Sequence, residues 1–199
     1  RRWCKVPYVF AELQKVKGEG QYPEYEDVLK AVQDAAYARA SDIWEGYEPG
    51  GLMPGPRQYG IGPLRKNDMA GNTTDSTPSG TYTFTKTITA TGWQDIFNYT
   101  VRDNMIHAFA GFAFTDQTLR VRQLRIEIGD RRYPVWDIQE AQLFNKFALI
   151  FKEDEAKELI ANPQERVLIR IEAESTGNQR VVPIGLSLFR TSNLVLTEV

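Results

Sequence analysis

A ten-residue run that is almost wholly apolar, residues 105–114, constrains the fold more than any other part of this 199-residue sequence. Its apolar side chains occupy both alternating sets, so a strand made of them has no polar face to turn toward water. Such a strand lies inside a sandwich or beneath a neighbouring segment. Two further strands joined by tight turns follow as far as Trp136, and we predict that residues 104–136 form the centre of the molecule.

The second strand of this centre, residues 119–128, alternates apolar and polar residues, but its phase slips by one position between Val121 and Leu124. A slip of one residue turns the buried face outward unless an extra residue bulges out of the ladder. We therefore predict a bulge at Arg122 and Gln123. The next two residues after the strand, Gly-Asp, predict a turn, and Pro134 makes the return strand short or an edge, since proline donates no N–H.

The remaining period-two patterns predict strands on both sides of this centre, at residues 81–91, 95–101, 146–151, 166–173 and 180–190, with a short helix at 153–161. The predicted fold class is mainly β, an antiparallel β-sandwich of jelly-roll type with an N-terminal helical hairpin and an extended arm. The predicted units are a helical segment (1–48), a Gly/Pro-rich arm or linker (49–80) and a β-sandwich domain (81–199).

The first unit reads as two helices, one from Pro7 to Lys17 and a longer one that begins at Pro23. Two helices with one apolar stripe each cannot enclose a core, so the stripe of the longer helix packs on the β domain or on another chain. Both alternatives stay open. On the second alternative, the candidate assembly contacts are the residues of the stripe: Leu29, Val32, Ala36, Ala40, Ile43 and Tyr47.

The second unit, residues 49–80, is rich in glycine and proline and has few residues able to form a core. Fully extended, it would reach on the order of 100 Å, well beyond a small domain. We interpret it as an arm laid across a neighbouring subunit, with a flexible tether as the alternative.

A search for chemistry finds few candidates. The net charge of −2 gives no reason to expect nucleic acid as a partner, and no apolar run is long enough to span a membrane. The single cysteine, Cys4, and the single histidine, His107, are too few for a zinc site, and His107 falls in the most apolar strand, which favours a packed core histidine. We predict no catalytic residue, metal or cofactor, and no enzymatic activity.

A β-sandwich with an N-terminal arm resembles jelly-roll virion structural proteins, in which the bodies tile a shell and the arms lock one subunit to the next. The resemblance is one of architecture, with residues 1–80 as arm and 81–199 as body, and it rests on no specific motif. It implies a non-catalytic structural subunit of a capsid, decoration or other coat-like assembly. The implied partners are copies of this chain and other structural proteins, and the implied location is a virion or the extracellular space.

The alternative function is a carbohydrate-binding β-sandwich module. Aromatic side chains stack on sugar rings, and the candidates are Trp93, Tyr133 and Trp136. Core packing explains the last two equally well, because both fall in a predicted strand.

Overall fold

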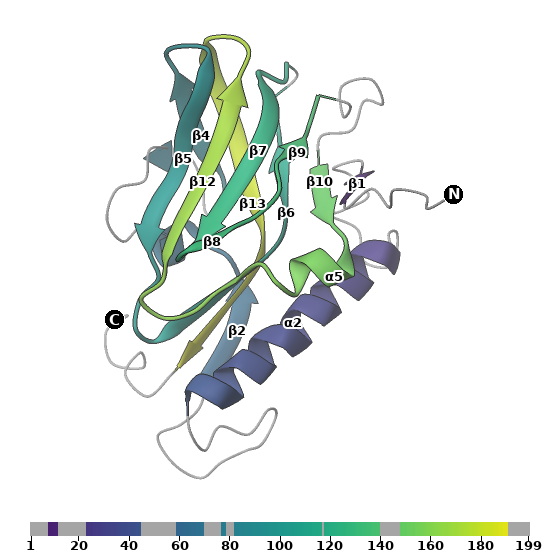
Figure 1. Ribbon diagram of the computed structural model, residues 1–199, viewed down its shortest axis with the longest axis vertical. Coiled ribbons are helices and arrows are strands. Elements are labelled where there is room, and N and C mark those ends of the chain that lie inside the picture. The colour runs from purple at the N-terminus through teal and green to yellow at the C-terminus, as the bar shows by residue number, and fades with distance from the viewer. Residues whose placement is uncertain are drawn as a thin grey trace.

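Two antiparallel sheets pack together in the computed structural model, and a long helix crosses the larger sheet (Figure 1). The structure describes residues 8–11, 23–44, 59–69, 77–78, 82–116, 118–139 and 148–190. The larger sheet has the order β1 (Tyr8–Ala11), β10 (Ala148–Phe151), β6 (Met105–Phe114), β13 (Gly177–Arg190), β4 (Phe84–Ile88) and β3 (Thr77–Pro78). Two short strands extend it: β11 (Ile160–Ala161) pairs with β6, and β2 (Tyr59–Pro63) pairs with β13.

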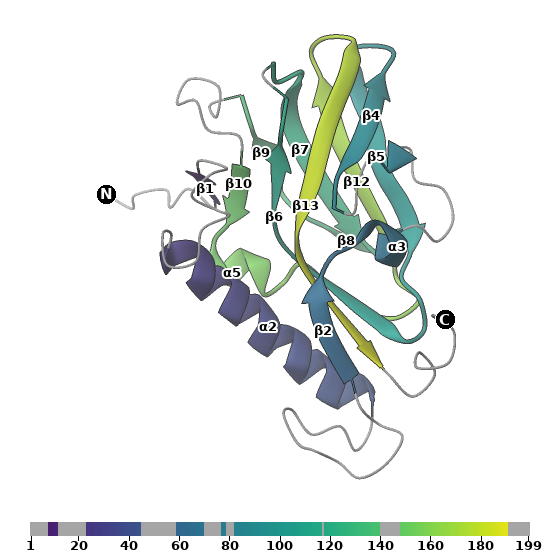
Figure 2. The ribbon, with the colours of Figure 1, turned by 180° about the vertical axis from the view of Figure 1, so that it is seen from behind.

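The smaller sheet has the order β5 (Gly92–Thr100), β12 (Arg166–Ala173), β7 (Val121–Ile128) and β8 (Arg131–Arg132), and β9 (Trp136–Asp137) also pairs with β7. The described helices are α2 (Pro23–Ile43), α3 (Lys66–Met69) and α5 (Glu153–Ala156). Seen from behind, in Figure 2, β13 and β6 of the larger sheet lie in front, and α2 runs diagonally past β2 and α5. Strands thus form at all five further positions that the sequence predicted, with ends shifted by a few residues.

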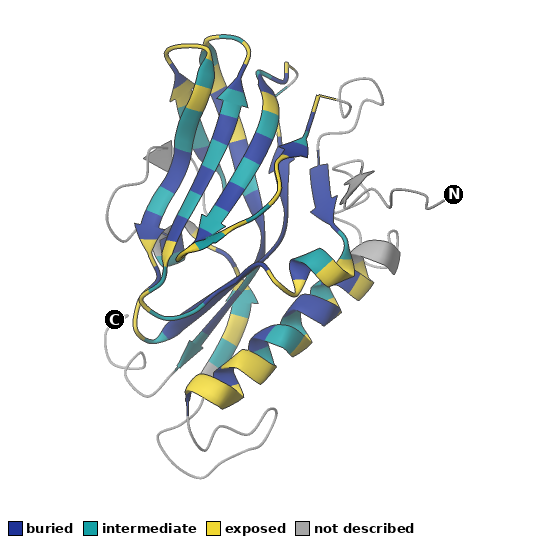
Figure 3. Ribbon diagram, in the orientation of Figure 1, coloured by how far each residue is buried: buried dark blue, intermediate teal, exposed yellow. Residues whose placement is uncertain are grey.

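Strand β6 is buried at all ten positions, as its two-sided apolar pattern predicts (Figure 3). It pairs with β13 on one side and with β10 and β11 on the other. One of its faces meets the smaller sheet, and α2 packs against it as well. This strand is therefore the centre of the molecule, enclosed in every direction.

The predicted bulge is confirmed on β7. Gln123 pairs with Glu172 and Val121 pairs with Ala173, which leaves Arg122 as the extra residue. The predicted turn also forms, with Gly129 at φ +57°, a left-handed conformation that glycine adopts without strain. The return strand is broken into β8 and β9, and Pro134 lies in the gap between them.

Helix α2 covers its own sheet. Its buried residues other than Ala31 belong to the same hydrophobic cluster as strands of both sheets, and the helix contacts β6, β13 and α5. The buried residues of α2 and of the position after it are Val28, Ala31, Val32, Ala36, Ala40 and Trp44. The buried residues of the stripe therefore pack on the β domain of their own chain, which was the first of the two predicted alternatives. The described part of residues 1–48 therefore shares its core with the sandwich.

Two predicted helices need correction. Tyr8–Ala11, assigned to a first helix, forms strand β1 on the edge of β10, so the N-terminal hairpin is not seen, and residues 12–22 lie outside the described residues. Helix α5 ends at Ala156 rather than at residue 161, and Ile160–Ala161 pair with β6 instead. In both cases a short apolar segment gains ladder hydrogen bonds from an open strand edge, which local helical spacing does not reveal.

The described parts of the Gly/Pro-rich segment also pack against the β domain of their own chain. Strand β2 pairs with the end of β13 and β3 pairs with β4. Leu64 and Met69 are buried in the common core. Residues 59–69 and 77–78 are therefore not stretched away from the body, and the rest of the predicted arm lies outside the described residues.

Candidate functional site

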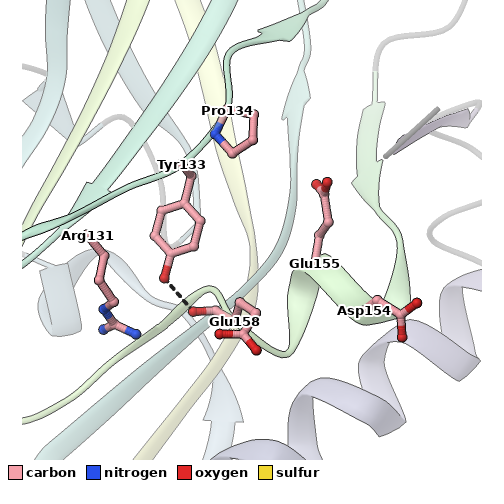
Figure 4. Close-up of a pocket in the computed structure, with 6 residues that line it drawn as sticks. All are labelled: Arg131, Tyr133, Pro134, Asp154, Glu155 and Glu158. Carbon is pink, nitrogen blue, oxygen red and sulfur yellow. Dashed lines mark hydrogen bonds between the residues drawn. The ribbon is translucent and has the colours of Figure 1, made fainter. Parts of the chain in front are cut away.

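A pocket of about 290 Å³ opens between the broken return strand and helix α5 (Figure 4). The break follows from Pro134, since its missing N–H interrupts the ladder. Residues 133–135 do not form a strand, although the N–H of Tyr133 still donates to Ile126 O of β7. The wall opposite comes from α5 and the turn after it. The lining residues are Arg131, Tyr133, Pro134, Asp154, Glu155 and Glu158.

Hydrogen bonds fix the walls of the pocket. Tyr133 Oη donates to the backbone oxygen of Glu158 at 2.6 Å, the contact drawn in Figure 4. Trp136 Nε1 donates to Glu155 Oε2 at 3.1 Å. Arg131 Nη2 donates to Ile160 O at 2.8 Å and to the carboxylate of Glu165 at 2.9 Å. The return segment and α5 are thus tied together at several points.

The pocket has an acidic character. Asp154 and Glu158 are exposed, and the guanidinium of Arg131 is paired with Glu165. Burial raises the pKa of Glu155, an effect that its hydrogen bond from Trp136 partly opposes. Burial also raises the pKa of Tyr133. A tyrosine ring and a proline beside carboxylates suit a positively charged group on a short apolar stem, such as a lysine side chain.

The sequence did not mark this pocket. Its acids occur in the first turn of a helix, where the helix dipole already explains them. Tyr133 entered only as a sugar-stacking candidate. The sequence feature that could have indicated the pocket is Pro134. It predicts a short or edge strand, but it does not indicate which segment packs opposite the break.

The three sugar-stacking candidates do not form one surface. Trp136 is 1% exposed, and the centre of its ring lies 4.7 Å from the centre of the Phe151 ring. Trp93, on β5, is 38% exposed, and the guanidinium carbon of Arg125 lies 5.1 Å from its ring centre. Strands β12 and β7 separate β5 from β8, the strand that leads into Tyr133. Only Trp93 presents an aromatic side chain on the open face of the smaller sheet.

The candidate assembly contacts differ in whether the structure leaves them exposed. Val32, Ala36 and Ala40 are at most 1% exposed and face this chain's own core, so they are not available to a neighbouring subunit. Leu29 is partly buried against the same core. Ile43, at the end of α2, keeps 40% of its surface exposed. Tyr47 lies outside the described residues.

His107 lies in the interior, as its apolar strand predicts, and bonds through Nδ1 to Tyr99 Oη at 2.8 Å. Burial, together with the nearby charge of Arg102, lowers the pKa of His107 to about 3. The ring is therefore neutral near pH 7. Sequence reasoning did not identify Tyr99 as its partner, because the two residues lie on strands of different sheets.

Within the described ranges, no three potential metal ligands gather into one group, and no helix has the length and apolar character needed to cross a membrane. No protein-family model matches the sequence, and a search of curated proteins finds no match either.

Proposed function

We propose that this protein is a non-catalytic structural subunit of a coat-like assembly and that its body has jelly-roll topology. The nested pairing of the strands supports the topology: β4 pairs with β13, β5 with β12, β6 with β10, and β7 with β8. The first strand of the body thus pairs with the last, the second with the second-last, and so on inward. A long antiparallel hairpin that is rolled into two sheets gives this pairing.

One fold serves many functions. Jelly rolls occur in viral capsid proteins, in lectins and in cupins. The observation that carries the structural role is the way in which the first 80 residues bind the body. Their described strands β1, β3 and β2 each add to the larger sheet, at β10, β4 and β13 respectively.

Strand addition uses main-chain hydrogen bonds and needs no special side chains, so it suits extended segments that join one surface to another. In the proposed assembly, copies of this chain and other structural proteins are the partners, and the location is a virion or the extracellular space. Contacts between subunits would use apolar side chains that the chain's own core leaves exposed. Ile43 on α2 and Ile61 on β2 are 40% and 36% exposed and are the described candidates.

The mass of the purified chain in solution tests this proposal. A single chain has a mass of 22.7 kDa. We expect sedimentation and light scattering across a wide range of concentrations to give species of higher mass that dissociate on dilution. A strict monomer at every concentration, alone and with the other proteins of its source particle, would overturn the proposal.

A matched pair of variants locates the contact. Ile43→Lys places a charge at an exposed apolar position, and Ser41→Lys places the same charge two residues earlier at another exposed position of α2. If Ile43 is a contact, the first variant weakens association about tenfold or more, which corresponds to about 1.4 kcal/mol. The second variant leaves association unchanged, and both keep the thermal midpoint of the parent.

One observation favours the alternative, a carbohydrate-binding module. Trp93 is 38% exposed on the open face of the smaller sheet, with the guanidinium of Arg125 over its ring, and an exposed aromatic ring is the kind of group that stacks on a sugar. On this alternative, Trp93→Ala abolishes binding on a glycan array without a change in the thermal midpoint. Tyr82→Ala, which removes another aromatic ring that is 42% exposed, is the control and retains binding.

A further inference from the structure

The buried histidine connects the two sheets through the core. His107 belongs to β6 of the larger sheet, and its partner Tyr99 belongs to β5 of the smaller sheet. Both side chains are at most 2% exposed, and their ring centres are 5.6 Å apart. The hydrogen bond between His107 Nδ1 and Tyr99 Oη is therefore a polar tie between the two sheets in a mainly apolar interior.

The neighbours of the ring on its own sheet are neutral. His107 pairs with Ser187 of β13 on one side and with Ala161 of β11 on the other. His107 Nε2 and Ser187 Oγ are both buried, and neither makes a hydrogen bond among the described residues. No carboxylate in the described part of the chain bonds to the ring, so a positive charge on it would have no directly bonded anion there.

One charged group nearby, Arg102, works against protonation of the ring. Arg102, in the turn between β5 and β6, repels a second positive charge. Burial, together with the Asp68 carboxylate of α3, raises the pKa of Tyr99 well above its ordinary value, so this partner stays a neutral hydroxyl. The ring thus has a neutral partner on one nitrogen, none on the other, and a repelling cation close by.

We propose that His107 is an acid-sensitive tie, whose protonation places an uncompensated charge in the core and loosens the two sheets from each other. The proposal concerns the stability of the body and does not depend on the assembly role. In an unfolded chain a histidine has its ordinary pKa of about 6.5, so below that pH the unfolded state binds more protons than the folded one. The stabilisation is complete above this pH and is lost as the pH falls toward the lower pKa of the folded state.

Because His107 is the only histidine of the chain, its contribution can be isolated with one substitution. Unfolding by urea is followed at several pH values for the parent and for His107→Gln, which keeps a side chain that can bond Tyr99. As the pH falls from about 6 to about 4, the unfolding equilibrium constant of the parent should rise relative to that of the variant. The ratio of the two constants should increase by about tenfold for each pH unit. Equal slopes would overturn the proposal.

A second measurement uses the unmodified chain. The ring ¹⁵N chemical shifts of the single histidine report its protonation state directly, and we expect a neutral ring in the native protein at every pH from neutral down to about 4.5. A native ring that becomes protonated near its ordinary pKa would refute the acid-sensitive tie. This measurement decides the question even if His107→Gln does not fold.

The tie itself is tested at neutral pH. Tyr99→Phe removes the hydroxyl that bonds the ring, whereas Ser187→Ala removes a buried hydroxyl without a hydrogen-bond partner among the described residues. We expect the first variant to lower the thermal midpoint and the second to leave it nearly unchanged. Equal effects of the two variants would show that the bond between the sheets carries no stabilisation.

Discussion

The two sheets differ in how they are covered. In the larger sheet, β6 and β10 are buried at every position, because the smaller sheet lies against one face and α2 contacts the sheet as well. In the smaller sheet, β12 alternates between buried and more exposed residues along its whole length. The contrast is visible in Figure 3, where β12 is banded and β6 is uniformly dark. The polarity pattern of a strand therefore reports how many layers cover it.

The open face of the smaller sheet is charged rather than apolar. Arg170 Nε lies 2.6 Å from Asp95 Oδ1, across β12 and β5. Arg125 and Glu127 form a second pair at 3.2 Å along β7. A face made of such pairs needs no further layer, because water solvates the charges that the pairs leave accessible.

The largest expected effect comes from disturbing the layer over the larger sheet. Val32→Asp puts a carboxylate at a fully buried position of α2, and we expect a loss of at least about 4 kcal/mol in the free energy of unfolding. Ile43→Asp, at an exposed position of the same helix, should cost less than about 1 kcal/mol. Chemical denaturation followed by circular dichroism compares the two, and similar losses would mean that α2 does not pack on the sheet in solution.

Two neighbouring residues of β12 should separate the faces of the smaller sheet. Ile169 is fully buried on the inner face, and Ile169→Ala should cost about 2–5 kcal/mol. Leu168 points to the open face and is only partly buried, so Leu168→Ala should cost less than about 1 kcal/mol. Thermal and urea unfolding measure both values. An equal cost would imply that another layer covers the open face.

A smaller effect is expected at a position where two strands of the larger sheet approach closely. A Cβ on Gly111 would lie 2.2 Å from the backbone oxygen of Leu149, so Gly111→Ala must push β6 and β10 apart and should cost about 1–3 kcal/mol. At Gly62 the nearest atom is a flexible arginine nitrogen at 3.7 Å, and Gly62→Ala should change stability by about 0.5 kcal/mol or less. Calorimetric midpoints distinguish the two substitutions.

The smallest effect is expected on the open face itself. A double-mutant cycle of Arg170→Gln and Asp95→Asn should give a coupling energy of at most about 1 kcal/mol, which added salt reduces. Both side chains are about one-third exposed, so water screens their attraction. A coupling of several kcal/mol that is insensitive to salt would mean that the pair is buried beneath a further layer.

Most of the body could be predicted from local patterns. The two-sided apolar run predicted β6, the phase slip predicted the bulge at Arg122, and a Gly-Asp pair predicted the turn that follows. The patterns failed where a short apolar segment could form either a helix or a strand. Tyr8–Ala11 was assigned to a helix because its spacing fits one, although the edge of β10 makes it a strand.

The candidate site was less predictable. The pocket brings together residues about twenty positions apart, and nothing in either segment indicates the other. The aromatic candidates were chosen by residue type, yet the structure buries Trp136 and leaves Trp93 on an open face. Val32, Ala36 and Ala40 of the predicted stripe are buried, whereas Ile43 is exposed. The partner of the stripe could not be predicted, since an apolar stripe looks the same whether it faces its own sheet or another chain.

The sequence alone determined the strands of the body, because the alternation of side chains along a strand is a local property with a fixed period of two. The tertiary structure decided which surfaces the remaining segments occupy. Open strand edges and uncovered apolar faces are properties of the folded sheets. Tyr8–Ala11 and Ile160–Ala161 pair with such edges, and α2 packs on such a face. The pairing of His107 with Tyr99 was decided in the same way, by the packing of one sheet on the other.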